Sequence, residues 1–354
     1  MSSELASYLQ MIEDLRGQVR QAIETLGNGF LDGDLIHRLQ EDEDLCRRYY
    51  GEILHIIYRT LFLLFAEQRG MMPGRDSLYA ESYSIARLRA RAEGDIPRED
   101  DFADLWEGLK VTFRMVREGV PALGVFGYDG MLFEDEADSL LASRAICNSD
   151  LLRAVRALTL IEREGVLQRI SYADLGVEEL GSIYESLLDF APRVTGRAEK
   201  IEEREIPPNT FFLDPRGLER KTTGSYYTPD SLVQCLLDSA LDPVVEEAVK
   251  GKSGADAEQA ILDLKICDPA VGSGHVVIAA AHRLAKRLAA VRTGDEEPAP
   301  DAVRTALRDV IGRCIHGVDV NPMAAELCKV ALWMEAVEPG KPLSFLDHHI
   351  QVGN

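Results

Sequence analysis

The chain has 354 residues, 46% of them hydrophobic and 28% charged, which is the composition of a soluble globular protein with room for two domains of ordinary size. Its six cysteines lie far apart and have no CxxC spacing, which argues against a zinc site and a secreted disulfide framework; we expect core thiols. The net charge of −21 argues against a chain that holds DNA by itself, because affinity for the phosphate backbone comes largely from Lys and Arg.

The acidic balance extends along the whole chain. Residues 1–220 hold 26 basic and 41 acidic side chains, and residues 221–354 hold 13 and 19. The N-terminus shows no signal sequence, and the most apolar stretch, 53–65, carries His55 and Arg59 and is too short to span a bilayer. We therefore expect a cytoplasmic protein without a membrane partner, in which 53–65 is a buried helix. If DNA is the substrate, most of the surface that binds it is expected to lie outside these 354 residues.

Helical periodicity dominates the first 200 residues. Between Leu5 and Leu26 apolar residues recur at three- and four-residue steps, which predicts an amphipathic helix that the GNG sequence at 27–29 ends. Further helices are expected over 50–68, 84–93, 102–118, 150–170 and 177–190. We predict a mainly α-helical domain over 1–205. Because the following residues are rich in charge and proline, we place a connection over 206–223.

From residue 224 the pattern changes to alternating strands and helices. We expect a buried strand over 262–267, a tight loop over 268–274, a helix over 275–291, a second strand over 314–318 and a helix over 322–336. This βαβα order begins a parallel sheet. The sequence therefore predicts an α/β domain over 224–354, following the helical one.

The loop DPAVGSG at 268–274 joins the first strand to its helix. Glycines let the backbone approach a ligand, and a helix N-terminus offers unpaired N–H groups to a nucleotide or a carboxylate. Such loops are a weak signal, since many serve only packing. Gly272 and Gly274 also lack the third glycine of the dinucleotide pattern, where Val277 stands, and this weakens the reading as a nicotinamide-dependent dehydrogenase.

An acid follows the second strand, in GVDVNP at 317–322. Asp319 is placed to accept hydrogen bonds from both hydroxyls of a ribose, as acids at the end of the next strand do in α/β sheets. The alternative is that Asp319 and Asn321 only cap the helix that begins at Pro322.

GSYYTP at 224–229 precedes a helix expected over 230–241, which Asp230 or Thr228 is able to cap. The three motifs GSYYTP, DPAVGSG and GVDVNP, in this order, resemble those of the amino-methyltransferases that modify adenine N6 in DNA. In that family the first motif closes over the methionine part of S-adenosylmethionine, the second forms the glycine loop, and the acid holds the ribose.

The resemblance extends beyond the cofactor motifs. LFAEQRGMMP at 64–73, GVEELGSIYESLLDF at 176–190 and LDHHIQVGN at 346–354 look like segments of the large methyltransferases of type IIG restriction-modification, BREX and DISARM systems, which place a helical region before the catalytic domain. It implies that 224–354 is the first half of a class I, Rossmann-like S-adenosylmethionine-dependent methyltransferase sheet. Asn354 stands where the family has a residue lining the adenine end of the cofactor. The implied cofactor-binding residues are Tyr227, Thr228, Pro229, Asp268, Pro269, Ala270, Gly272, Ser273, Gly274, Asp319, Val320 and Asn321.

The amine-accepting motif of the family is missing. The N6 amine of adenine is a poor nucleophile, and family members accept its protons with (Asn/Asp)-Pro-Pro-(Tyr/Phe), a tetrapeptide that these 354 residues do not contain. We therefore expect no catalytic residue and no metal ligand here, and a chain that is inactive alone.

Two functions fit these observations. The first is a site-specific DNA adenine-N6 methyltransferase of a restriction-modification or phage-defence system, present as a fragment or split subunit. Its complete form binds double-stranded DNA, and a downstream polypeptide carries the catalytic motif and the target-recognition region. The alternative is a non-catalytic S-adenosylmethionine-binding subunit that regulates a partner.

Overall fold

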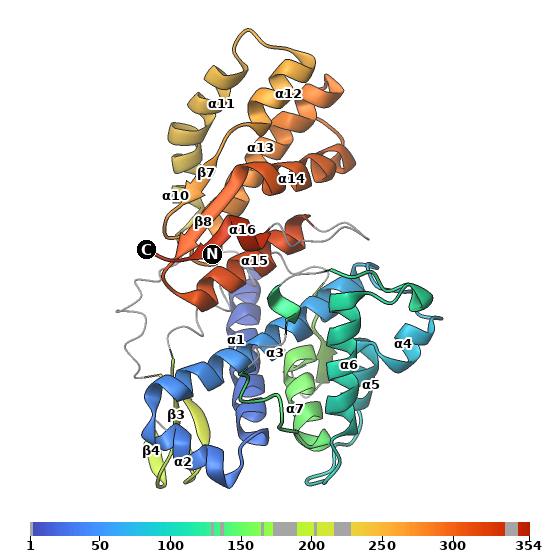
Figure 1. Cartoon of the computed structure of the whole chain (residues 1–354), viewed down its shortest axis with the longest axis vertical. Coiled ribbons are helices and arrows are strands. Elements are labelled where there is room, and N and C mark those ends of the chain that lie inside the picture. The colour runs from blue at the N-terminus through green and yellow to red at the C-terminus, as the bar shows by residue number, and fades with distance from the viewer. Residues whose placement is uncertain are drawn as a thin grey trace. The chain divides into compact units, whose positions relative to one another are not determined.

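The computed structural model describes residues 3–128, 131–134, 138–163, 166–172, 190–201, 204–215, 228–336 and 346–354. These residues divide into two compact units, one made of residues up to 215 and the other of residues from 228 onward (Figure 1). Except for Phe190, the helix expected over 177–190 lies outside the described residues.

The first unit is built mainly from helices. They are α1 (Ser3–Gly29), α2 (Gly33–Glu41), α3 (Glu43–Gln68), α4 (Leu78–Ser82), α5 (Ile85–Ala92), α6 (Asp104–Glu118) and α7 (Asn148–Thr159), with 3-10 turns η1 (Pro121–Leu123) and η2 (Met131–Phe133). The helices expected over 5–26, 50–68, 84–93 and 102–118 are thereby confirmed. The apolar stretch 53–65 lies within α3 and is almost wholly buried, as expected. No helix among the described residues is long and apolar enough to cross a membrane.

The helix expected over 150–170 is wrong in its second half. α7 ends at Thr159, and the antiparallel hairpin of β1 (Leu160–Arg163) and β2 (Val166–Arg169) follows. Spaced apolar residues in so short a segment suit either a helix or a hairpin, and periodicity alone does not separate the two.

Four more short strands were not expected. β3 (Ala191–Val194) pairs antiparallel with β6 (Phe211–Asp214), and β4 (Glu199–Ile201) pairs with β5 (Arg204–Ile206). β3 and β4 lie within the domain predicted to be mainly helical, and β6 lies within the predicted connection. All four residues of β6 are buried. The segment through Asp214 is therefore part of the first unit, so residues 206–214 of the expected connection belong to that unit.

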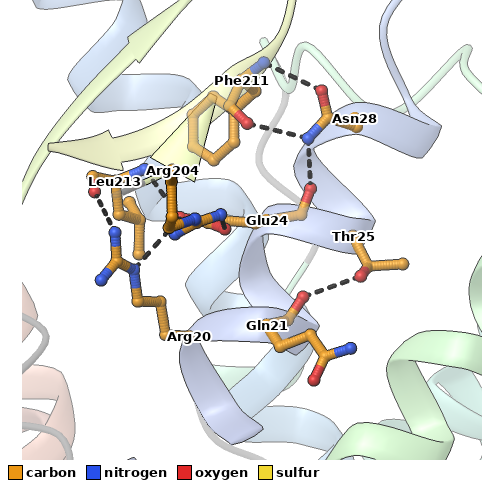
Figure 2. Close-up of polar contacts among 8 residues, drawn as sticks. All are labelled: Arg20, Gln21, Glu24, Thr25, Asn28, Arg204, Phe211 and Leu213. Carbon is orange, nitrogen blue, oxygen red and sulfur yellow. Dashed lines mark hydrogen bonds and ion pairs between the residues drawn. The ribbon is translucent and has the colours of Figure 1, made fainter. Parts of the chain in front are cut away.

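Side chains of α1 take the place of a neighbouring strand along the free edge of β6. Asn28 accepts a hydrogen bond from the Phe211 N–H (2.9 Å) and donates one to the Phe211 carbonyl (2.8 Å), as a paired strand residue would. One turn earlier, Glu24 accepts from the Leu213 N–H (3.2 Å), and a further turn earlier Arg20 donates to the Leu213 carbonyl (2.8 Å). Figure 2 shows this ladder of residues spaced by four along one helix face. It satisfies edge groups that would otherwise be exposed to another strand.

The glycines of GNG also serve close packing. α1 ends at Gly29, within the range predicted for its end. A Cβ on Gly27 would lie 2.3 Å from the Phe211 ring, and one on Gly29 would lie 2.6 Å from the Ile146 side chain. Only glycine lets α1 approach β6 and the α7 entry this closely.

Gly27→Ala is therefore expected to destabilise the protein by about 1–3 kcal/mol, because the added methyl group overpacks the site against a ring that is itself fully buried. Chemical denaturation followed by circular dichroism measures the change. Gly17→Ala is the matched control, since a Cβ at Gly17 of the same helix meets nothing within 4 Å and should stabilise by about 0.5–1 kcal/mol. Equal effects of the two substitutions would contradict the packing role.

The second unit places helices around a small parallel sheet. Its helices are α10 (Asp230–Leu236), the π-helical turn η4 (Leu237–Leu241), α11 (Asp242–Val249), α12 (Gly254–Leu262), α13 (His275–Thr293), α14 (Pro300–Cys314), α15 (Pro322–Ala336) and α16 (Leu346–His349). The sheet has the order β7 (Ile266–Asp268), β8 (Ile315–Asp319), β9 (Ile350–Val352), with both pairings parallel. Both expected strands and the helices expected over 275–291 and 322–336 are present, but α14 between α13 and β8 was not expected, and the first strand begins only at Ile266, since Leu262 belongs to α12.

The sheet is covered unevenly. Along β8 the residues Ile315, Gly317 and Asp319 are buried while His316 and Val318 between them are half-buried, so the described helices cover one face more fully than the other. β7 is an edge strand of the described sheet, and its Cys267 is exposed. The cysteines are accordingly not all core thiols: Cys46, Cys314 and Cys328 are buried, but Cys235 and Cys267 are exposed.

Candidate functional site

The carboxyl ends of the three strands lie at one edge of the sheet. In the parallel register Asp268 of β7 stands opposite Gly317, and Asp319 of β8 stands opposite Val352. Asp268, Asp319 and the residues that follow β9 therefore gather where α/β sheets bind their ligands.

The loop 269–274 folds back over this edge. Asp268 accepts a hydrogen bond from the Ala270 N–H (2.9 Å), and the Val271 N–H donates to the Val318 carbonyl (2.9 Å), which brings the loop onto the neighbouring strand. Pro269 and Ala270 are exposed, while Val271 and Ser273 are buried. The loop thus presents its first residues to solvent and anchors its later ones.

Gly274 has a backbone conformation and surroundings that exclude a side chain. Its φ of 92° lies in the left-handed region, and a Cβ there would be 2.8 Å from Cys328 Sγ. Burial raises the pKa of the Cys328 thiol, which stays neutral and fills the space behind the loop. Gly274 immediately precedes α13, whose first N–H groups have no side-chain cap.

Asp319 fastens the glycine loop to the end of β8. The residue is 9% exposed; one carboxylate oxygen accepts from the Gly272 N–H (2.9 Å) and the other from the Asn321 N–H (2.8 Å). A carboxylate has about four lone-pair sites, so these two bonds orient Asp319 and leave it able to accept more.

Asn321 caps α15, as the simpler interpretation of GVDVNP had it. Its side-chain oxygen accepts from the Met323 N–H (3.0 Å), and its carbonyl accepts from the Ala325 N–H (3.1 Å). Asp319 takes no part in this cap. Val320 between them is 56% exposed and faces solvent.

The first motif is described only at its end. Tyr227 lies outside the described residues, and Thr228 and Pro229 are exposed. In the part of the chain that the structure describes, no hydrogen bond joins either residue to the glycine loop. Neither Thr228 nor Asp230 caps α10, contrary to expectation: Pro229 occupies the cap position, and Asp230 accepts from the Gln234 side chain (3.0 Å) instead.

Arg283 of α13 fixes the helix that follows this motif, and sequence reasoning missed it. Its guanidinium bonds Asp238 (2.9 Å) and Asp242 (2.5 Å), and it donates to the Gln234 side chain (2.8 Å). Since Gln234 is on α10 and Asp238 on η4, this one side chain ties both elements to α13. The sequence around a charged residue in a helix does not indicate which residues of other helices it will bond.

A second missed residue is Lys329 on α15. It is 8% exposed and pairs with Glu326 (2.7 Å) and Asp347 (3.5 Å). Asp347 belongs to α16, so the pair ties the segment before β9 to the helix after Asp319. Among the described residues no group of His, Cys, Asp and Glu is placed to hold a metal ion.

Comparison with known proteins finds similarity in the part of the chain that holds this site. Residues 216–343 match the family described as N-6 DNA Methylase. The adenine-specific methyltransferase PglX of Streptomyces coelicolor is 34% identical over 131 residues, which cover 36% of this chain and 9% of that protein. A putative type II restriction enzyme and methyltransferase of Methanocaldococcus jannaschii is 26% identical over 182 residues, covering 40% of this chain and 15% of that protein.

A solved structure resembles both units. The type IIL restriction-modification enzyme MmeI, determined in complex with DNA, matches with a TM-score of 0.52 and 14% identity over 92% of this chain and 36% of its own. This likeness supports a methyltransferase fold. The chain spans only a small part of each relative. The segment 216–343 resembles the N-6 DNA methylase family, and the resemblance of the chain to the adenine methyltransferases of restriction-modification and BREX-like systems is confirmed.

Proposed function

We propose that the chain is the helical and cofactor-binding part of an S-adenosylmethionine-dependent, site-specific DNA adenine-N6 methyltransferase of a restriction-modification or phage-defence system in the cytoplasm. The observation that carries the proposal is the bond between Asp319 and the Gly272 N–H, which joins the ribose-binding acid and the glycine loop into one site. The family match over 216–343 supports the same chemistry.

The residues of the site fit S-adenosylmethionine. Asp319 is oriented by two backbone donors and retains acceptor capacity for ribose hydroxyls. Asp268 uses one oxygen on the Ala270 N–H, and its charge suits the methionine ammonium. The cofactor, when bound, supplies an electrophilic methyl group. The chain's own part is to bind and orient it.

We assign the remaining contacts in the same way. Tyr227, Thr228 and Pro229 close over the methionine part, and Val320 and Asn321 line the ribose side of the pocket. The loop residues Pro269, Ala270, Gly272, Ser273 and Gly274 bring backbone N–H groups to the cofactor. In this proposal β7, β8 and β9 with α13 and α15 form the first half of a class I, Rossmann-like sheet over 224–354.

We propose that in the complete enzyme further strands and helices extend this sheet beyond the unpaired edge of β7. On β7 the edge away from β8 has no strand partner among the described residues, and α10, which contacts α13, exposes Leu232 and Leu236. An unpaired strand edge and exposed apolar side chains are both suited to covering by further strands and helices. We infer that a downstream polypeptide supplies them, together with the amine-accepting motif and the target-recognition region that binds double-stranded DNA.

The alternative is a non-catalytic S-adenosylmethionine-binding subunit that regulates a partner. It is favoured by the absence of an (Asn/Asp)-Pro-Pro-(Tyr/Phe) tetrapeptide from the chain. Both functions use the same cofactor residues and differ in whether a partner completes a catalytic site.

The 354-residue chain alone is expected to transfer no methyl group to DNA, because it has neither the amine-accepting motif nor a basic balance to hold a duplex. Tritium transfer from labelled S-adenosylmethionine to mixed genomic DNA measures this. Incorporation at adenine N6 only after adding the downstream polypeptide supports the split enzyme, and none in either case favours the regulatory subunit. Incorporation by the chain alone, abolished by Asp319→Ala, would show that the catalytic groups are present in it.

A further inference from the structure

Lys329 is a buried cation for which the proposed cofactor contacts give no role. It lies on α15, the helix that follows Asp319, and is only 8% exposed. Its ammonium pairs with Glu326 of the same helix at 2.7 Å and with Asp347 of α16 at 3.5 Å. Burying a lysine is costly unless its charge is paired. Because two carboxylates already hold the ammonium, Lys329 is placed to act through these partners rather than on a ligand.

The segment that Lys329 reaches is too short to fix its own position. α16 is a single turn, and β9 has three residues at the edge of the described sheet. A first helical turn is unfavourable by itself, and an edge strand pairs on one side only. Leu346 and Ile350 are buried, but apolar contacts are non-directional. The ion pair between Lys329 and Asp347 adds a directional tie from this segment to α15.

The same segment continues to Asp319. β9 pairs with β8 so that Val352 stands opposite Asp319, and the Gly353 N–H donates to the Asp319 carbonyl (2.9 Å). The Asp319 carboxylate meanwhile accepts from the Gly272 N–H (2.9 Å). Asp319 is therefore bonded to two segments, to the glycine loop through its side chain and to the residues after β9 through its main chain.

From these contacts we propose that Lys329 is a positioning residue of the cofactor site. By holding Asp347 it fixes α16 and β9, and through them the segment 352–354 beside Asp319. The proposal rests on the proposed function, since it takes the ligand at Asp319 to be S-adenosylmethionine. A segment that is fixed before the ligand arrives needs no ordering on binding, so affinity depends on a side chain that does not touch the ligand.

Two matched substitutions test this role. Asp347→Asn removes the carboxylate that joins Lys329 to α16, whereas Glu326→Gln removes the carboxylate on the same helix as Lys329. Each variant loses one negative charge beside the same ammonium and keeps the other to pair it. In calorimetric titration of the full chain with S-adenosylmethionine, we expect Asp347→Asn to weaken binding roughly tenfold and Glu326→Gln to change it less than about twofold.

A double-mutant cycle assigns the effect to the pair itself. Lys329→Met keeps the apolar stem of the side chain without its charge and should also weaken binding. The double variant Lys329→Met, Asp347→Asn should bind about as weakly as the weaker-binding single variant, because both changes break the same contact. If Lys329→Met does not fold, the comparison of the two acid variants still decides.

Hydrogen exchange without ligand measures the position of the segment directly. The amides of 350–353 should exchange faster in Asp347→Asn than in the native chain or Glu326→Gln, while the amides of α13 keep their native rates. Faster exchange throughout α13 would mean that the pair stabilises the unit as a whole, and it overturns the positioning role.

The titrations separate this proposal from the proposed function. S-adenosylmethionine that binds the native chain and Asp347→Asn equally overturns the positioning role alone, as do equal losses in the two acid variants or additive losses in the double variant. No binding by the folded native chain contradicts the proposed function, and the positioning role with it. Circular dichroism confirms that the variants are folded.

Discussion

Asp319→Ala is expected to weaken the binding of S-adenosylmethionine by about 1–3 kcal/mol, because the substitution leaves ribose hydroxyls without a charged acceptor. A second effect adds to the first. The same change frees the Gly272 N–H that Asp319 now holds, so the glycine loop loses its tie to β8. Isothermal calorimetry on the purified chain measures the change in affinity.

Two further variants separate these effects. Asp319→Asn keeps the size of the side chain but replaces one acceptor oxygen with an amide that cannot accept from an N–H, so we expect an intermediate loss of affinity. Asn321→Ala removes the cap of α15 but leaves the bond between Asp319 and the Gly272 N–H, so it should lower stability by about 0.5–2 kcal/mol while affinity changes less than in Asp319→Ala. Native affinity in Asp319→Ala would remove Asp319 from the site.

Glu67→Ala is expected to destabilise the first unit by about 2–3 kcal/mol, because three donors lose their acceptor together. Glu67 accepts from the Tyr79 hydroxyl (2.8 Å) and from the Ile85 (2.8 Å) and Ala86 (2.9 Å) N–H groups. The last two are the first N–H groups of α5, where a carboxylate also opposes the positive end of the helix dipole. Urea denaturation gives the free energy of unfolding.

Glu81→Ala is the control for Glu67. Glu81 is an exposed residue of the neighbouring α4, and loss of its carboxylate should change stability by less than about 0.5 kcal/mol. A Glu67→Ala variant as stable as Glu81→Ala would show that the carboxylate does not hold α5.

Short stretches of sequence predicted those helices and strands that depend mainly on residues close together in the chain. The helix expected over 322–336 has those bounds in the structure, because proline at its start and a continuous apolar face specify it without reference to other elements. β6 was missed for the opposite reason. Phe211 and Leu213 pair with side chains of α1 some 180 residues earlier in the chain, and no short window of sequence contains that partner.

The candidate site shows the same division. Asp319 and the glycine loop were predicted from motifs, since strand ends in a parallel sheet must meet. The side chains that support them were not. Cys328 behind Gly274 and Arg283 beneath α10 act through packing across helices, which the order of residues along the chain does not reveal.

The most direct test of the account is calorimetric titration of the native chain with S-adenosylmethionine and, separately, with NAD. The account predicts that S-adenosylmethionine binds and NAD does not, because Val277 stands where the dinucleotide pattern needs its third glycine. It also predicts that Asp268→Asn, which keeps an oxygen for the Ala270 N–H but removes the charge offered to the methionine ammonium, weakens binding. Binding of NAD, or no binding of S-adenosylmethionine by the folded chain, would contradict it.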